Sequence, residues 1–270
     1  MRLKTMPNDL LKVIDSHVHL DFDEFEPQRE QLVEQMRQQG IVDAVIPGVS
    51  VERWGKLIEI AKRYQCHYAL GIHPWYSSQN WQADVSLLEQ YLAAGRDESS
   101  LVAIGECGLD GFHRDSWQWQ LPCFEAHLAL AQRYQLPIII HSVKAHNEVL
   151  MLLKRYPLVR GGVIHGFYGG SELAKRYLDA GMKLGIGHLL LDETAKKLPE
   201  TIVNLPLTSF VIETDLALIS KVKKREIADE INGSSLILHL LIEKIANLQK
   251  KSCVLVSEQV FQNTLQLFDL

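Results

Sequence analysis

The sequence predicts a single (β/α)₈ barrel of the TIM type, and two observations lead to this prediction. Short apolar runs alternate with longer amphipathic stretches from one end of the 270 residues to the other. This alternation implies parallel strands joined by crossover helices. The strand–helix unit occurs eight times, which matches a closed barrel of about 250 residues better than an open sheet.

The expected strands are short, apolar and rich in β-branched residues. Most of them end in Gly, Pro or a polar residue, and each is too short to be a buried helix. They occupy residues 12–15, 43–48, 68–73, 101–106, 137–142, 162–167, 183–188 and 209–215, with helix-like segments between them, such as 26–39, 51–64 and 116–135. A doubly wound sheet is the alternative, but no Gly-rich phosphate loop follows the first strand.

The chain continues beyond the eighth strand through residues 221–270. This part predicts one or two closing helices, with Leu236, Leu240 and Ile245 on an apolar stripe that we expect to join the core. The sequence contains no composition break, linker or low-complexity segment. We therefore expect residues 1–270 to form one domain.

Composition narrows the class of protein. The chain is 47% hydrophobic and 23% charged, as is usual for globular proteins. The four cysteines are far apart in the sequence, which indicates reduced thiols. The sequence shows no secretory signal and no membrane span, so we expect a cytoplasmic protein that does not bind a membrane. No obligate protein partner is expected either. The net charge of −5 argues against a broad basic surface for nucleic acid, although it does not exclude a nuclease.

Residues suited to metal binding fall at the carboxyl ends of the apolar runs, the face where barrel enzymes build their active sites. They are His17, His19, Glu106, His141, His165 and Asp215. Two histidines at i and i+2 on a strand project to the same side, so both rings can reach one ion. Four imidazoles and two carboxylates suit Zn²⁺ and, with less preference, Mn²⁺, Co²⁺ or Ni²⁺. Alone, each would more often be structural, but six at one rim predict a metal site.

Six motifs carry a resemblance to a known family, and five of them contain these residues. DSHVHLD, GIHP, GECGLD, IIIHS, IHGF and IETD follow one another between Ile14 and Asp215. In order and spacing they resemble the TatD family of metal-dependent, deoxyribonuclease-like hydrolases. Related amidohydrolases often bridge their metals with a modified lysine from the fourth strand. Glu106 at that position favours the TatD-like branch.

The resemblance implies a site for two divalent ions, with zinc preferred and Mn, Co, Ni or Mg as alternatives. Glu106 would bridge the ions, His17, His19 and Asp215 would complete the shell of one, and His141 and His165 that of the other. Such a pair activates a water for attack on DNA or another phosphodiester. Glu106 and Asp215 are then the expected catalytic residues, with Asp215 orienting the water and taking its proton.

Residues outside this set have weaker assignments. His73, in GIHP, could hydrogen-bond a substrate phosphate, and a structural role at the turn before Pro74 is an equal alternative. A phosphate contact is a secondary reading for the basic run Lys221, Lys223, Lys224 and Arg225. His67, His127, His146 and His239 are expected to be structural or solvated. Strand alternation turns Cys107 away from the side that carries Glu106.

The chain departs from the family pattern around the substrate rather than at the expected ligands. Leu216 and Ala217 follow Asp215 where relatives have a small residue and Pro, and Val143 stands where relatives have Arg. The loop after the eighth strand also differs. Two alternatives to a nuclease therefore remain: a metal-binding barrel with lost or minor catalysis, and a hydrolase of a small phosphate ester or amide.

Overall fold

The structure is a computed structural model that describes residues 11–95, 99–216 and 237–270. Eight parallel strands are paired in chain order from β1 to β8. Their bounds are β1 Val13–Asp15, β2 Ile41–Pro47, β3 His67–Leu70, β4 Leu101–Asp110, β5 Ile138–Val143, β6 Gly162–Ile164, β7 Met182–Ile186 and β8 Phe210–Ile212. Each expected apolar run overlaps one of these strands, so the predicted (β/α)₈ barrel is confirmed.

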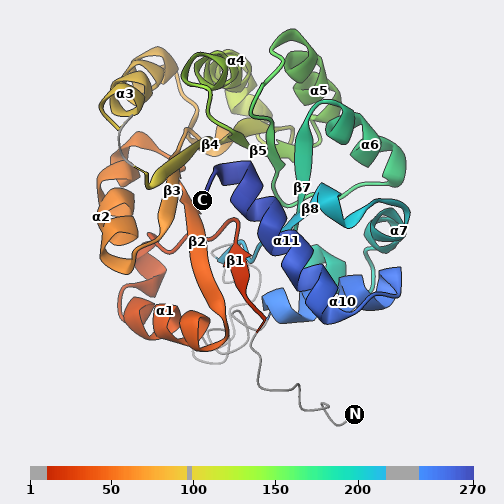
Figure 1. The fold of residues 1–270 in the computed structure, drawn as a ribbon. Coiled ribbons are helices and arrows are strands. Elements are labelled where there is room, and N and C mark those ends of the chain that lie inside the picture. Colours follow the sequence, from red (N-terminus) through yellow and green to blue (C-terminus); the bar gives the residue numbers. More distant parts are fainter. Residues whose placement is uncertain (1–10, 96–98, 217–236) are drawn as a thin grey trace.

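Helices follow the strands and surround them (Figure 1). The α-helices between strands are α1 Arg29–Gln38, α2 Trp54–Tyr64, α3 Trp81–Ala94, α4 Trp117–Tyr134, α5 His146–Arg155, α6 Ser171–Asp179 and α7 Lys197–Asn204. Two closing helices, α10 Ile237–Gln249 and α11 Cys253–Phe268, complete the described chain. In Figure 1, α11 crosses the barrel, and the carboxyl terminus lies near the middle of the barrel. None of the described helices is long and apolar enough to cross a membrane.

Hydrogen bonds between the ends of β1 and β8 bring the two edges of the sheet together. The backbone N–H and the hydroxyl of Ser16 both donate to the Ile212 carbonyl, at 3.1 and 3.0 Å. The buried Asp15 carboxylate accepts from the backbone N–H of Thr214 at 3.0 Å and from its hydroxyl at 2.7 Å. These contacts place the segments after β1 and β8 next to each other, and both carry predicted ligands.

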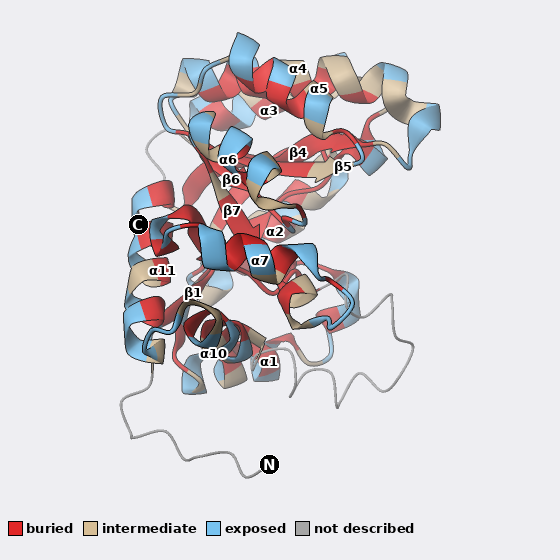
Figure 2. Ribbon diagram, turned by 90° about the vertical axis from the view of Figure 1, so that its right-hand side faces the viewer, coloured by how far each residue is buried: buried red, intermediate tan, exposed pale blue. Residues whose placement is uncertain are grey.

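Alternation along the strands separates two apolar regions. In β5, Ile138 and Ile140 belong to the large core between strands and helices, whereas Ile139 belongs to a smaller cluster that fills the barrel. Leu267 and Phe268, from the end of α11, pack into this inner cluster. Figure 2 shows the result, with buried strands inside and helices exposed on their outward faces.

The closing helices agree only in part with the expected apolar stripe. Ile245 is fully buried, as predicted, but Leu240 is 43% exposed, so its assignment to the core was wrong. The buried stripe of α10 runs instead through Leu238, Leu241 and Ile242. Leu236 lies outside the described residues.

Candidate metal centre

The six predicted ligands converge at the carboxyl-terminal rim, although few of them lie in a strand. His17 and His19 follow β1, His165 directly follows β6, and Asp215 lies three residues beyond β8. Glu106 and His141 lie within β4 and β5. All six side chains are buried. The expectation that His17 and His19 lie on a strand was wrong, yet their Nε2 atoms are only 3.2 Å apart.

One carboxylate oxygen of Glu106 faces the residues that follow β1. Its Oε2 lies 3.3 Å from His17 Nε2 and 3.6 Å from His19 Nε2. Asp215 Oδ1 approaches the same two nitrogens, at 4.0 and 3.6 Å. The Asp215 oxygen makes no hydrogen bond within the described part of the chain. Two imidazole nitrogens and two carboxylate oxygens therefore converge on one buried point.

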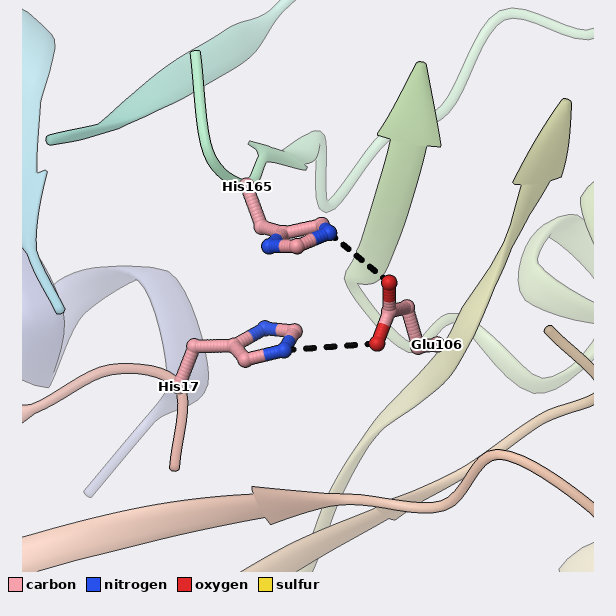
Figure 3. A group of neighbouring side chains, drawn as sticks. All are labelled: His17, Glu106 and His165. Atoms are coloured by element: carbon pink, nitrogen blue, oxygen red, sulfur yellow. Dashed lines mark ion pairs between the residues drawn. The ribbon is translucent and has the colours of Figure 1, made fainter. Parts of the chain in front are cut away.

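The other oxygen of Glu106 faces a second group of histidines. Its Oε1 lies 2.7 Å from His165 Nε2, and 3.3 Å from both His141 Nδ1 and His73 Nε2. Figure 3 shows the carboxylate between His165 on one side and His17 on the other. The imidazole rings of His17 and His165 are stacked, with their centroids 4.1 Å apart. Glu106 is thus shared by two groups of side chains.

His73 differs from the other histidines in how its ring is held. Its Nδ1 accepts a hydrogen bond from the backbone N–H of Trp75 at 3.2 Å. Burial, only partly opposed by Glu106, lowers the pKa of His73 to about 4, so the ring is neutral at neutral pH. A neutral imidazole that accepts at Nδ1 carries its proton on Nε2. The Nε2 atom that faces Glu106 is therefore a hydrogen-bond donor. The Nδ1 contact caps the short helix that begins at Pro74, which is the structural role given as the equal alternative, and the phosphate contact stays a prediction.

Charge is strongly coupled across the cluster. Burial by itself would raise the pKa of Glu106, but the surrounding imidazoles, led by His165, lower it well below its usual range. In turn, Glu106 outweighs the effect of burial on His165 and raises its pKa well above the ordinary value. Burial, reinforced by His17, lowers the pKa of His19 and keeps it neutral, with a lone pair available for a metal. Without a metal, the positive charge that balances Glu106 must come from protons on the surrounding imidazoles.

This donor set fits divalent cations. Three overlapping groups of ligand atoms, each within 4.8 Å of one another, combine Glu106 with His17 and His165, His17 with His19 and Asp215, and Glu106 with His73 and His141. Imidazole nitrogens that face one another at hydrogen-bond distance need a shared proton or a cation between them. A divalent ion replaces such protons, since metal ligands must be deprotonated. Nitrogen and carboxylate ligands together suit zinc and its first-row neighbours.

Two acidic residues that sequence reasoning missed lie behind the ligands. Asp110 Oδ2 lies 3.2 Å from His141 Nε2 and accepts from Trp75 Nε1 at 2.6 Å. Glu213 accepts from the backbone N–H of Gly166 and lies 3.8 Å from His165 Nδ1. Carboxylates in this position orient the imidazoles of metal sites. Their spacing in the sequence was the available signal: Glu213 lies two residues before Asp215, and Asp110 lies four residues after Glu106.

His67, His146 and Cys107 have the structural surroundings that were expected. His67 pairs with Asp43 at 3.0 Å, and His146 contacts the Ser142 and Tyr177 hydroxyls. Cys107 is buried in the core between strands and helices, on the side of β4 away from the barrel interior. The basic run Lys221, Lys223, Lys224 and Arg225 lies outside the described residues.

Comparison with known proteins shows which family the chain is similar to. The family model described as TatD related DNase matches residues 14–269. The uncharacterized metal-dependent hydrolase YjjV of Escherichia coli is 37% identical over 211 residues, which are 76% of this chain and 80% of that protein. The 3'-5' ssDNA/RNA exonuclease TatD of Pantoea ananatis is 30% identical over 264 residues, 96% of this chain and 100% of that protein.

The fold comparison leads to the same family. The crystal structure of E. coli YjjV matches with a TM-score of 0.83 at 30% identity, over 97% of this chain and 99% of that one. A TatD family hydrolase of Entamoeba histolytica shares the fold, with a TM-score of 0.78 at 20% identity. With its barrel, its buried cluster of histidines and carboxylates and a family match along nearly its whole length, this chain belongs to the TatD family of metal-dependent hydrolases.

Proposed function

We propose that this protein is a two-metal phosphodiesterase that acts on single-stranded DNA or RNA. The observation that carries the proposal is the position of Glu106, whose two oxygens face two different groups of histidines. A carboxylate in this position can bridge a pair of ions, and two-metal enzymes use such a pair of ions to clamp a phosphodiester. The nuclease names of TatD relatives support this substrate class.

Each residue then has a defined task. His17, His19, Asp215 and Glu106 Oε2 would hold one ion, and His141, His165 and Glu106 Oε1 the other. Bound divalent ions, with zinc preferred and Mn, Co, Ni or Mg as alternatives, would polarise a phosphodiester oxygen and lower the pKa of a water. The Asp215 carboxylate, whose Oδ1 faces the same ion as His17 and His19, would orient the attacking water and accept its proton.

His73 is proposed to bind substrate rather than metal. Its Nε2 carries the proton, because Nδ1 already accepts from Trp75. A donor at this position can hydrogen-bond an oxygen of the substrate phosphate next to the ions. With His73 assigned to substrate, the six proposed ligands remain those predicted from the sequence.

Metal content and hydrolysis, measured together, test the proposal. The purified protein should bind two divalent ions and cleave a single-stranded oligonucleotide. Glu106→Gln should bind less metal and lose hydrolysis while the barrel stays folded, because a neutral amide cannot offset the charge of two cations. Glu59→Gln, at an exposed position of α2, is the matched control and should behave like the parent.

Three results would replace this proposal. Full metal content and activity in Glu106→Gln would remove the bridging role. Cleavage of small phosphate monoesters or amides but no phosphodiester would show that the substrate is a small ester or amide and not a nucleic acid. If the protein binds metal but hydrolyses none of these compounds with Zn²⁺, Mn²⁺, Co²⁺, Ni²⁺ or Mg²⁺, the barrel is a metal-binding protein without this catalysis.

A further inference from the structure

Beside the candidate metal centre lies a tryptophan with a large exposed surface. Trp75 belongs to the short 3-10 helix Pro74–Tyr76, which follows β3 at the same rim as the ligands. Its side chain is 42% exposed, although tryptophan is usually well buried. Its ring centroid lies 5.0 Å from that of His73 and 6.4 Å from that of His141. The indole is therefore a direct neighbour of the proposed substrate and metal residues.

A buried carboxylate fixes the orientation of this indole. Trp75 Nε1 donates to Asp110 Oδ2 at 2.6 Å, and the same oxygen lies 3.2 Å from His141 Nε2. Asp110 Oδ1 accepts from the backbone N–H of Phe112 at 2.8 Å, which holds the carboxylate in place. One side chain thus positions both a proposed metal ligand and an exposed aromatic ring. A ring held in advance loses little conformational entropy when a ligand stacks on it.

Further aromatic side chains and a cation continue along the same part of the rim. Tyr76 is also exposed, and its ring centroid lies 6.4 Å from that of His73. Phe112, in the loop after β4, is 71% exposed, and Lys144 Nζ lies 6.0 Å from its ring. Because β3, β4 and β5 are neighbours in the barrel, these side chains lie along one stretch of the mouth. Aromatic rings combined with basic groups are typical of surfaces that bind single-stranded nucleic acid.

We propose that Trp75 is a stacking platform for an unpaired nucleobase of the strand whose phosphate lies at Glu106. This inference rests on the proposed function, because the position of the cleaved phosphate comes from it. A base is separated from its own phosphate by one sugar, so a ring directly beside His73 and His141 is in reach of that base. A paired base in a duplex has its faces covered and cannot stack on an indole. Small phosphate esters have no base to bind there.

Steady-state kinetics on two strands test the platform. One is a single-stranded oligonucleotide, and the other is an abasic strand with the same number of phosphates. For Trp75→Ala we expect the KM for the normal strand to rise about tenfold, as the loss of one base–aromatic stack predicts. The kcat on that strand and the KM for the abasic strand should stay near the parental values. Trp75→Phe keeps a ring and should recover part of the affinity.

A matched control and a binding measurement complete the test. Tyr91→Ala removes an exposed aromatic ring from α3, on the helical layer, and should leave both KM values unchanged. Fluorescence anisotropy with a labelled, phosphorothioate-linked strand that resists cleavage gives the Kd independently of turnover. We expect the Kd of Trp75→Ala to rise by a factor similar to that of the KM.

The two proposals fail in different ways. If Trp75→Ala cleaves and binds the normal strand as the parent does, the platform is wrong while the phosphodiesterase proposal stands. Equal parental KM values for the normal and abasic strands would also overturn the platform. If the parent cleaves no phosphodiester yet Trp75→Ala binds the strand more weakly, base stacking on Trp75 is supported, while the proposed function, and with it the position of the phosphate at Glu106, is wrong.

Discussion

Asp215 is held by its backbone in a way that leaves its side chain available. Its φ of 49° lies in the left-handed region, which Asp adopts more readily than most residues. Its backbone N–H donates to the His17 carbonyl at 3.0 Å, so the segment after β8 is tied to the segment after β1. The Oδ1 atom then faces His17 and His19 without a hydrogen bond to the described residues.

This arrangement predicts that Asp215 contributes more to turnover than to folding. Asp215→Asn keeps the shape and still offers an oxygen to a metal, but an amide does not accept the proton from the attacking water. We expect kcat to fall about 10²–10⁴-fold, the usual contribution of a general base. Metal content should fall only in part and the melting temperature should change little. Steady-state kinetics, metal analysis and thermal unfolding measure the three quantities.

Asp179→Asn is the matched control for this variant. Asp179 is exposed at the end of α6, and we expect the parental kcat, metal content and stability after this substitution. Parental kcat in Asp215→Asn would exclude Asp215 as the proton acceptor, even if the metal centre is real.

For single residues, the sequence predicts the candidate ligands better than it predicts the residues that orient them. The clustering of the six candidate ligands could be predicted because His and carboxylate residues at strand ends must meet at one rim of a barrel. Asp110 was missed because the expected strand stopped at Glu106, whereas β4 continues to Asp110. The tautomer of His73 follows from the position of the Trp75 N–H, which local sequence does not determine.

The packing of helix α4 against the end of β3 depends on a buried histidine. His127 accepts at Nε2 from the backbone N–H of Ile72 at 3.1 Å, and its Nδ1 lies 2.7 Å from the Cys123 carbonyl. These two contacts fit a neutral ring with its proton on Nδ1. Since Ile72 precedes His73, α4 helps to hold the loop that carries His73.

The His127 contact predicts a loss of stability in mild acid. Burial, partly opposed by the Cys123 carbonyl, lowers the pKa of His127 from 6.5 to about 4. A histidine whose pKa is lower in the folded than in the unfolded protein stabilises the fold at a pH above the unfolded pKa. This contribution to the free energy of unfolding disappears as pH falls from 6.5 towards 4. Its full size is about 3 kcal/mol. In His127→Gln the free energy of unfolding should therefore differ less from the parent at pH 4.5 than at pH 7.5.

Urea unfolding of the metal-free proteins at both pH values gives this difference. Leu128→Ala, at a buried position of the same helix, destabilises the packing without removing a titrating group. Its deficit relative to the parent should be the same at the two pH values. An equally constant deficit in His127→Gln would show that His127 does not contribute to the acid sensitivity.

Element types were more predictable than the faces of the helices. Eight short β-branched runs are a strong signal because each barrel strand is buried on both sides. The stripe of α10 was misjudged at Leu240, because Ile237–Gln249 is apolar around much of its circumference. Which side of such a helix is covered depends on its packing partners, here α11, α7 and the 3-10 helix His188–Leu191, and not on its own periodicity.

The barrel as a whole separates its proposed chemistry from part of its stability. The candidate ligands gather at the carboxyl-terminal rim, while the end of α11 reaches the barrel interior with Leu267 and Phe268. These two side chains pack with Val45, Val102 and Ile139 from three different strands. Phe268 is the one aromatic side chain in this inner cluster of described residues. Residues at the rim for activity and residues at the opposite end for stability are the general pattern of this fold.

This separation predicts a variant that is less stable but fully active. Phe268 is almost completely buried, and Phe268→Ala should lower the free energy of unfolding by about 3–5 kcal/mol through lost burial and a cavity in the barrel. Metal content and kcat, measured well below the melting temperature, should match the parent because the rim is unchanged. Val254→Ala, at a position of α11 that is 54% exposed, should change stability by less than about 0.5 kcal/mol. A loss of metal in Phe268→Ala that parallels the loss of stability would show instead that the inner cluster and the rim act as one unit, and the division between the two ends would be wrong.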